Sequence, residues 1–274
     1  MTFSIVGRSN DGRSLGVAVA SKFLAVGSAV PAARLSAGAI ATQSFANTLY
    51  RRDGLALLSA GKNAQETLDV LLAADELREE RQAGVVDARG GSATWSGSDC
   101  LDWAGGISGP NVAVQGNILT GPDVVEQMHR SWNQLVDRPL AERLWGALAA
   151  GDLAGGDRRG RQSAALLVVS DAGAYTPGDD LAYDLRVDDH HAPVTELRRL
   201  LDLHHVYFDP PAPEDLMPLA GDVAAEVEAL LATIGQPTLE TWAGIENYEM
   251  RLVSGQIDSF VLDKLRESAA SVRD

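Results

Sequence analysis

The first residues of the chain alternate between apolar and polar character with a period of two, which is typical of a β-strand. Phe3 and Ile5 lie on one face of this strand, and the residues between them lie on the other. A second strand is expected over residues 15–20, and the Asp-Gly pair at 11–12 is a turn signal of β-hairpins. The pattern therefore predicts a β-hairpin at the very start of the chain, with Thr2 in its first strand.

Blocks of strands and blocks of helices follow one another along the rest of the chain. Helical spacing is expected between residues 50 and 75, where Asn63 is placed to cap the second of two helices. Other strands are expected at SAVPAAR, AGAIATQ, GVVDARG, GSATWSG, NVAVQGN, QSAALLVVS and LAYDLRV, and other helices at 122–134, 139–151 and 193–207. Because the strands come in hairpin blocks rather than in β-α alternation, we expect antiparallel sheets with helices on their outer faces.

The breaker-rich segment DPPAPEDL at 209–216 predicts a linker between two domains. Residues 1–208 are expected to form an α+β fold, a four-layer αββα sandwich of two antiparallel sheets. Segments such as GVAVA and ALLVV are apolar on both faces, as strands covered on both sides are. Residues 217–274 predict a small helical domain, with helical spacing at 220–234, 241–253 and 258–269.

The charge balance excludes several classes of function. The 274 residues carry 23 Lys and Arg against 38 Asp and Glu, which gives a net charge of -15. Such a surface repels phosphate backbones and anionic lipid headgroups, so we expect neither a nucleic acid nor a membrane as partner. No signal peptide is recognisable, and the single Cys100 cannot form an intramolecular disulfide; we expect a cytoplasmic protein with Cys100 as a small buried side chain.

Thr2 gains a distinctive chemistry if Met1 is removed, because one residue then carries a hydroxyl and a free α-amine. The amine, with an ordinary pKa of about 7.7–8.0, can accept the hydroxyl proton and make the oxygen a nucleophile. An even hairpin register would bring Lys22 beside Thr2, and an odd register would bring Ser21 there. A Lys22 ammonium in that place would lower the pKa of the amine.

Two further segments carry candidate chemistry. GGDRRGRQSAALLVV at 155–169 concentrates positive charge, and its functional interpretation is a site for an anionic group, with Arg158 binding it and Asp157 and Ser163 orienting the reacting centre. The alternative is a basic surface turn before a core strand. VQGN ends at Asn117, where the side-chain amide or backbone N–H groups could stabilise an oxyanion.

No cofactor and no metal are expected. No glycine-rich phosphate-binding motif follows a predicted strand. The run of Asp and His at 188–191 cannot meet one metal ion, because neighbouring residues of a strand point to opposite faces.

Six segments occur in order between Thr2 and about Phe208: TFSIVGR, LGVAVASKFLAVGSAVP, QAGVVDARG, VAVQGN, GGDRRGRQSAALLV and DLRVDDH. They resemble a bacterial family, the domain of unknown function 1028 family, which is assigned to the N-terminal nucleophile (Ntn) hydrolases together with the proteasome β subunit. The resemblance implies the αββα fold, hydrolysis of amide bonds and Thr2 as nucleophile. The proteasome's aspartate has no counterpart in the strand that ends at Lys22. The tail from Thr241 to Glu267 is similar to a peptidoglycan-binding module often attached to this family.

Two functional hypotheses follow. In the first, the protein is an Ntn-type amidohydrolase of a small-molecule or peptide amide, in which Lys22 tunes the Thr2 amine and donors near Asn117 bind the oxyanion. In the second, it is a non-catalytic protein of the same fold that binds an anionic peptide or glycan through its arginine cluster. A further alternative, an assembly or scaffold protein, and the expectation of a homo-oligomer come from the resemblance alone.

Overall fold

The computed structural model describes residues 2–172, 176 and 178–272, which form two compact units, Met1–Leu200 and Leu201–Asp274. The units divide within helix α6 (Pro193–Phe208), whereas the sequence placed the end of the first domain at residue 208. Each unit has a hydrophobic core of its own.

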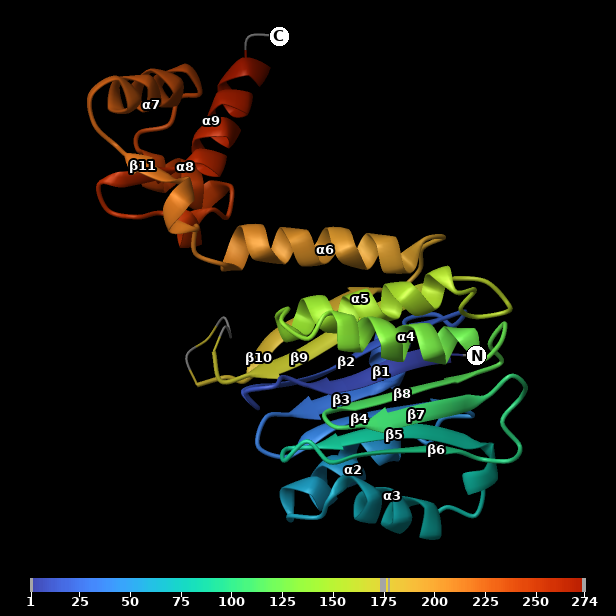
Figure 1. Ribbon diagram of the computed structural model, residues 1–274. Helices are drawn as coiled ribbons and strands as arrows, with labels where there is room; N and C mark the ends of the chain where they lie inside the picture. The colour runs from blue at the N-terminus through green and yellow to red at the C-terminus, as the bar shows by residue number, and fades with distance from the viewer. Residues whose placement is uncertain (1, 173–175, 177, 273–274) are drawn as a thin grey trace. The chain divides into compact units, whose positions relative to one another are not determined.

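Two antiparallel sheets make up the first unit (Figure 1). The larger sheet has six strands, in the order β10 (Leu181–Val187), β9 (Ser163–Ser170), β2 (Ser14–Ser21), β1 (Thr2–Arg8), β8 (Val112–Asn117) and β7 (Gly105–Gly109). The smaller sheet has four, in the order β3 (Pro31–Arg34), β4 (Gly38–Ser44), β5 (Arg81–Asp87) and β6 (Ser92–Ser96). The predicted hairpin is β1 and β2, and its turn contains Gly12 at φ 77°.

Helices cover the outer faces of both sheets, as Figure 1 shows. Helices α4 (Asp123–Gln134) and α5 (Leu140–Leu153) pack on the six-stranded sheet, and α2 (Leu49–Ser59) and α3 (Ala64–Ala73) pack on the four-stranded sheet. The predicted αββα sandwich is therefore confirmed. The predicted cap of α3 is also present: Asn63 Oδ1 accepts from the Glu66 N–H, and Glu66 Oε2 accepts from the Asn63 N–H, each at 2.9 Å.

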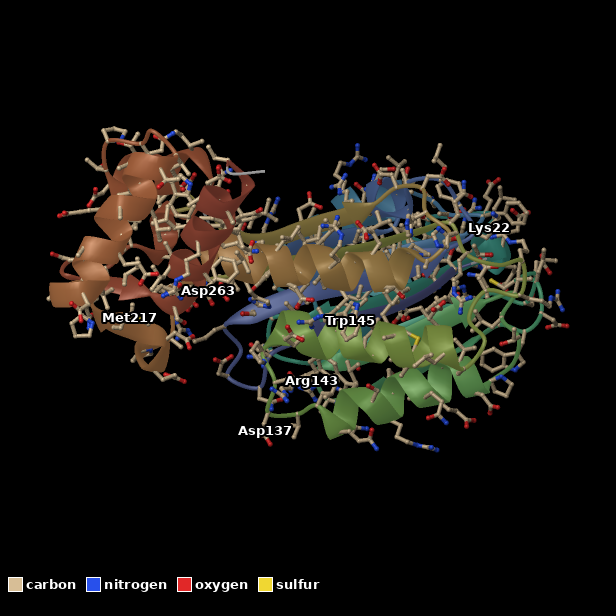
Figure 2. All side chains as sticks on the ribbon, turned by 90° about the horizontal axis from the view of Figure 1, so that it is seen from above. Lys22, Asp137, Arg143, Trp145, Met217 and Asp263 are labelled. Atoms are coloured by element: carbon tan, nitrogen blue, oxygen red, sulfur yellow. The ribbon has the colours of Figure 1, made fainter. Side chains whose placement is uncertain are left out.

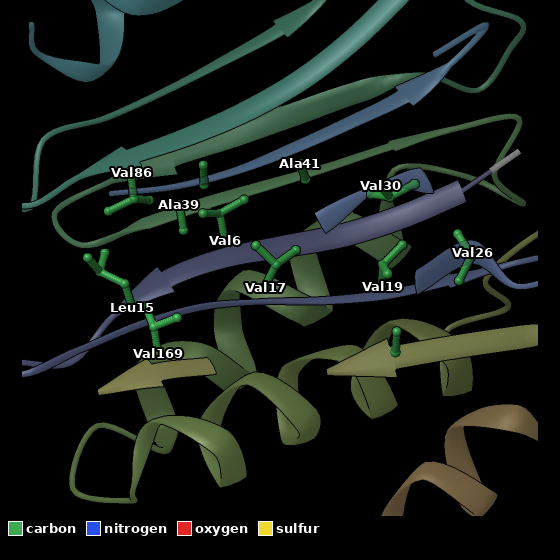
Figure 3. Close-up of a cluster of buried hydrophobic side chains, with 12 residues drawn as sticks. Val6, Leu15, Val17, Val19, Val26, Val30, Ala39, Ala41, Val86 and Val169 are labelled. Carbon is green, nitrogen blue, oxygen red and sulfur yellow. The ribbon is translucent and has the colours of Figure 1, made fainter. Parts of the chain in front are cut away.

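The space between the sheets is filled by small aliphatic side chains (Figure 3). Val6, Val17 and Val19 of the central hairpin face Ala39 and Val86 of the other sheet, and all of them are fully buried. Val6 shares its face of β1 with Thr2 and Ser4, because side chains alternate along a strand. The intersheet face therefore changes from apolar to polar toward the beginning of β1.

Two local predictions for the first unit differ from the structure. The segment SAVPAAR was expected to be one strand, but helix α1 (Val26–Ala29) occupies its first part and β3 begins at Pro31. The Val26 N–H donates to Ser163 Oγ (3.1 Å) and the Val30 N–H donates to the Val26 carbonyl (3.1 Å), which closes a helical turn. Strand β7 was not expected, because its sequence GGISG lacks an apolar alternation.

The second unit is rich in helix, with α7 (Gly221–Thr233), α8 (Leu239–Ile245) and α9 (Ser259–Ser271) beside a short pair of strands, β11 (Leu216–Pro218) and β12 (Gln256–Asp258). Trp242, Val261 and Leu265 lie at the centre of its core. Helix α8 ends earlier than predicted, because the Tyr248 N–H donates back to the Ala243 carbonyl at 2.7 Å. Throughout the described part of the chain, no helix has both the length and the apolar character needed to span a bilayer.

Candidate active site

Strand register brings four polar residues together across four neighbouring strands. Thr2 on β1 pairs with Asn117 on β8. The register of β1 with β2 pairs Phe3 with Ala20, and its continuation places Ser21 opposite Thr2. Ser21 in turn pairs with Ser163 on β9. These four residues, here called the polar row, are all buried, and their side chains face the four-stranded sheet.

Thr2 and Ser21 form the centre of the polar row, with their hydroxyl oxygens 3.0 Å apart. The hairpin therefore has the odd register of the two that the sequence allowed. The placement of Lys22 beside Thr2, which the even register required, is wrong. The Lys22 side chain is exposed at the outer end of the sandwich (Figure 2), and its Nζ lies 3.4 Å from the Arg161 carbonyl oxygen.

Two glutamines of the four-stranded sheet, Gln43 and Gln82, form hydrogen bonds with the strands that carry the polar row. Gln82 Nε2 donates to the Gly116 carbonyl at 2.7 Å, and because a carbonyl can only accept, this bond fixes the orientation of the Gln82 amide. Gln82 Oε1 then accepts from Gln43 Nε2 (2.7 Å) and from Asn117 Nδ2 (2.9 Å). Gln43 Nε2 also donates to the Thr2 carbonyl at 3.2 Å. The main chain of Thr2 is thereby anchored to the opposite sheet.

Asn117 is oriented by this network. Its Nδ2 donates to Gln82, so its Oδ1 is left as an acceptor, buried and without a hydrogen bond among the described residues. An unpaired buried acceptor costs about 1–3 kcal/mol. The sequence suggested the Asn117 amide as a donor to an oxyanion, but in the structure Nδ2 already donates to Gln82. The unsatisfied atom is Oδ1, which can only accept a hydrogen bond.

Sequence reasoning missed the glutamines. Gln115 extends the network, donating to Ser4 Oγ at 2.6 Å, and Ser4 Oγ donates to Gln43 Oε1 at 2.6 Å. Gln115 Oε1, like Asn117 Oδ1, is buried without a hydrogen bond among the described residues. Gly84 makes room for it, because a Cβ there would lie 2.0 Å from Gln115 Oε1. The signal was present: a glutamine on the inward face interrupts each of three apolar strands, in IATQS, RQAGVV and VAVQGN.

The arginine-rich loop is joined to the end of β2 by Asp157. The Asp157 carboxylate, 2% exposed, accepts from the Lys22 N–H (2.7 Å) and from the Arg159 N–H (2.9 Å). Arg159 Nη2 lies at the longer distance of 3.4 Å from the same carboxylate. The Arg158 side chain is exposed, and Arg159 rather than Arg158 lines the pocket described below.

Ser163 orients the chain that follows β2 rather than a reacting group. Its Oγ donates to the Phe23 carbonyl at 2.5 Å and accepts from the Val26 N–H at 3.1 Å. Since Phe23 is a wall of the pocket, Ser163 fixes that wall through the main chain.

A pocket of about 330 Å³ opens at Thr2. Two members of the polar row line it together with a second serine, large apolar side chains and one arginine: Thr2, Phe23, Ser44, Phe45, Leu101, Asn117, Ile118 and Arg159. Phe23, Phe45 and Leu101 are each more than half exposed. Ser44 (φ 72°) and Ile118 (φ 50°) have left-handed backbone conformations, which are costly for a β-branched residue such as isoleucine. Strain of this kind concentrates at functional sites.

A second cavity, of about 510 Å³, lies between α2 and α3 and is mostly apolar. Asp75 in its lining accepts hydrogen bonds from Asn47 Nδ2 (2.9 Å), Tyr50 Oη (3.0 Å) and Arg81 Nε (3.0 Å). Burial by itself raises the pKa of Asp75, but these bonds and that of the Leu77 N–H outweigh it and hold the pKa well below its ordinary value. Asp75 is thus a structural carboxylate, and through Arg81 Nη1, which donates to the Phe45 carbonyl, it supports a wall of the Thr2 pocket.

Among the described residues, no group of three or more His, Cys, Asp or Glu side chains is arranged so that it could bind a metal ion. The polar groups that line the Thr2 pocket are the hydroxyls of Thr2 and Ser44, the Asn117 amide and the Arg159 guanidinium. The Ser21 hydroxyl does not line the pocket but lies 3.0 Å from that of Thr2.

Comparisons with known proteins identify the family of this chain. The chain is similar over 82% of its length to protein SPO2555 from Silicibacter pomeroyi, a crystal structure assigned to the family DUF1028, with 26% identity, a TM-score of 0.67 and 92% of that chain covered. It is also similar to Anbu (ancestral beta-subunit) from Yersinia bercovieri, with 11% identity, a TM-score of 0.33, and 73% of this chain and 93% of that chain covered. No curated protein matches the chain.

Two family descriptions match different parts of the sequence. Residues 207–265 match a domain described as "Putative peptidoglycan binding domain". Residues 2–197, which include the whole polar row and the arginine-rich loop, match the family of unknown function DUF1028. The chain therefore belongs to the DUF1028 family.

Proposed function

We propose that the protein hydrolyses an amide bond, with Thr2 as the nucleophile after removal of Met1. One observation carries the proposal: Thr2 begins the central strand, lines a pocket, and has its hydroxyl 3.0 Å from a second buried hydroxyl, that of Ser21. A threonine hydroxyl needs a base within hydrogen-bonding reach, and the α-amine that trimming creates is on the same residue.

The reaction that we propose has two halves. Thr2 Oγ1 attacks the amide carbonyl carbon while its proton passes to the α-amine, directly or through the Ser21 hydroxyl. The C–N bond then breaks, the proton moves to the departing nitrogen, and the acyl group remains as an ester on Thr2. Water attacks this ester with the amine again as base, and the products are a carboxylic acid, an amine and the free Thr2 hydroxyl.

Asn117 has a positioning role in this proposal. Its backbone is opposite Thr2 in the sheet, and its Oδ1 is a buried acceptor without a donor among the described residues. The α-amine brings additional N–H groups to this place when Met1 is removed. Asn117 Oδ1 would accept one of them and turn the lone pair of the amine toward the hydroxyl.

Mass spectrometry with an electrophilic probe tests the proposal. The intact mass is expected to show loss of Met1, and a β-lactone is expected to add to the chain at Thr2. Thr2→Ser keeps a hydroxyl and should be labelled, whereas Thr2→Ala and the near-isosteric Thr2→Val should not. Labelling that persists in Thr2→Ala would disprove the assignment of the nucleophile.

The non-catalytic alternative is distinguished by the same experiment. A chain that retains Met1, resists the probe and still binds an anionic peptide or glycan would support a binding protein. The match of residues 207–265 to a peptidoglycan-binding description makes peptides derived from peptidoglycan a reasonable first set of ligands and substrates for both hypotheses.

A further inference from the structure

Arg159 is the one charged side chain among the described residues that line the Thr2 pocket. The pocket thus has a positive charge in a protein with 38 acidic and 23 basic residues. Close to half of the Arg159 side chain is exposed, so its guanidinium is accessible to a ligand in the pocket. Guanidinium groups bind carboxylates and phosphates through charge-assisted hydrogen bonds.

The position of Arg159 is built into the fold. Asp157 accepts two short bonds from main-chain N–H groups, those of Lys22 (2.7 Å) and Arg159 (2.9 Å), and its contact with the guanidinium is much longer, at 3.4 Å. The buried carboxylate therefore holds the main chain of the loop at two points. Asp157 joins the loop to Lys22, the residue that follows Ser21 at the end of β2. Arg159 is thereby kept close to the polar row.

The rest of the pocket limits the ligand in size and character. A volume of about 330 Å³ is at the lower end of the range of small-molecule sites. Phe23, Phe45 and Leu101 expose large apolar side chains around it, and a ligand that covers them removes apolar surface from water. A small ligand with one apolar group and one anionic group matches this lining.

We infer that the site accepts small amides that carry a carboxylate next to an apolar group, as N-acylated apolar amino acids do, with the carboxylate bound by Arg159. That the ligand contains an amide bond rests on the proposed function. That it carries a carboxylate next to an apolar group rests on Arg159 and on the apolar lining of the pocket. A carboxylate is favoured over a phosphate by the small volume and by the single cation.

Binding to a non-reacting variant tests the inference separately from hydrolysis. N-acetyl-L-phenylalanine and its uncharged carboxamide are titrated by NMR into the full-length Thr2→Ala chain, labelled with ¹⁵N. We expect the carboxylate to bind about tenfold more tightly than the carboxamide, which corresponds to one charge-assisted pair. Adding Arg159→Met should reduce this ratio to about one, whereas adding Arg158→Met, the exposed neighbour, should leave it unchanged.

Arg159→Met keeps the main-chain N–H that Asp157 binds, so the loop is expected to fold, which an unchanged Tm would verify. Equal affinity for the two probes, an undiminished ratio in Arg159→Met, or no measurable binding of either probe would overturn the inference. Tenfold preference in a chain that never hydrolyses an amide would leave the inference standing and remove only the proposed function.

Discussion

Substitution of Ser21 tests the chemistry that we propose for Thr2. Its Oγ is the atom that lies 3.0 Å from Thr2 Oγ1, and it is 2% exposed. In this position the Ser21 hydroxyl can orient the proposed nucleophile and accept its proton.

Ser21→Ala is expected to slow labelling of Thr2 by a β-lactone about a hundredfold, because a positioned proton-transfer group contributes at least that much. The rate is measured by mass spectrometry as a function of probe concentration. Ser14→Ala, at the other end of the same strand, is the matched control and should react at the wild-type rate. A Ser21→Ala chain that reacts as fast as the control would show that the hydroxyl pair has no part in activation.

Asp75 makes stability depend on pH. Its hydrogen bonds depress its pKa in the folded state below the unfolded value of about 3.9. The resulting stabilisation is present above that unfolded value and is lost as the pH falls through the folded pKa. The free energy of unfolding should therefore decrease on acidification below about pH 4. Urea unfolding at a series of pH values should show a shallower decrease for Asp75→Asn, and an equally steep one would refute this role.

At the scale of elements, the polar row and the glutamines opposite it join the two sheets by hydrogen bonds at one end of a largely aliphatic core. Gln82 is the centre, because its amide bonds to β4, β6 and β8 at once. Loss of one member of such a buried network leaves its partners without hydrogen bonds, which is costly where the local dielectric is low.

Gln82→Leu should lower the free energy of unfolding by about 3 kcal/mol, since the change leaves several buried partners unsatisfied. Urea denaturation measures the loss. Gln65→Leu on the exposed face of α3 is the control and should change it by less than about 0.5 kcal/mol. A loss in Gln82→Leu no greater than that of the control would mean that the network does not stabilise the sandwich.

Much of the element structure could be predicted because local signals sufficed. The turn at residues 11–12 set the hairpin, and Asn63 set the start of α3. Register decides the rest, and local sequence left two registers open. The sequence allowed either Ser21 or Lys22 beside Thr2, and the pairing of β1 with β2 in the structure is the odd register.

The candidate site was only partly predictable for the same physical reason. Thr2, Ser21, Ser163 and Asn117 were all found from strand ends, and pairing puts them in one row. The choice of Arg159 over Arg158 depends on how Asp157 folds its loop, which spacing does not encode. Gln43 and Gln82 were overlooked because their hydrogen-bond partners are in the six-stranded sheet, far from them in the sequence.

At the scale of the whole molecule, the two units have separate cores and are expected to unfold separately. Leu148 of α5 and Leu265 of α9 are both fully buried, each in its own unit. Leu→Ala at such a site costs about 2–5 kcal/mol. Calorimetry should show two transitions, with Leu148→Ala lowering one and Leu265→Ala lowering the other. A single transition shifted by both substitutions would show that the units unfold together.

The second residue of the chain contributes to the wall of its own pocket, and this has a practical consequence. Any affinity tag fused ahead of Thr2 would have to start from inside that pocket and would leave no free amine there. If Thr2 acts as we propose, protein purified through an amino-terminal tag would be inactive in every substrate screen. Affinity tags should therefore be placed at the C-terminus. A negative activity assay is evidence against the proposed hydrolysis only when the tag is at that end.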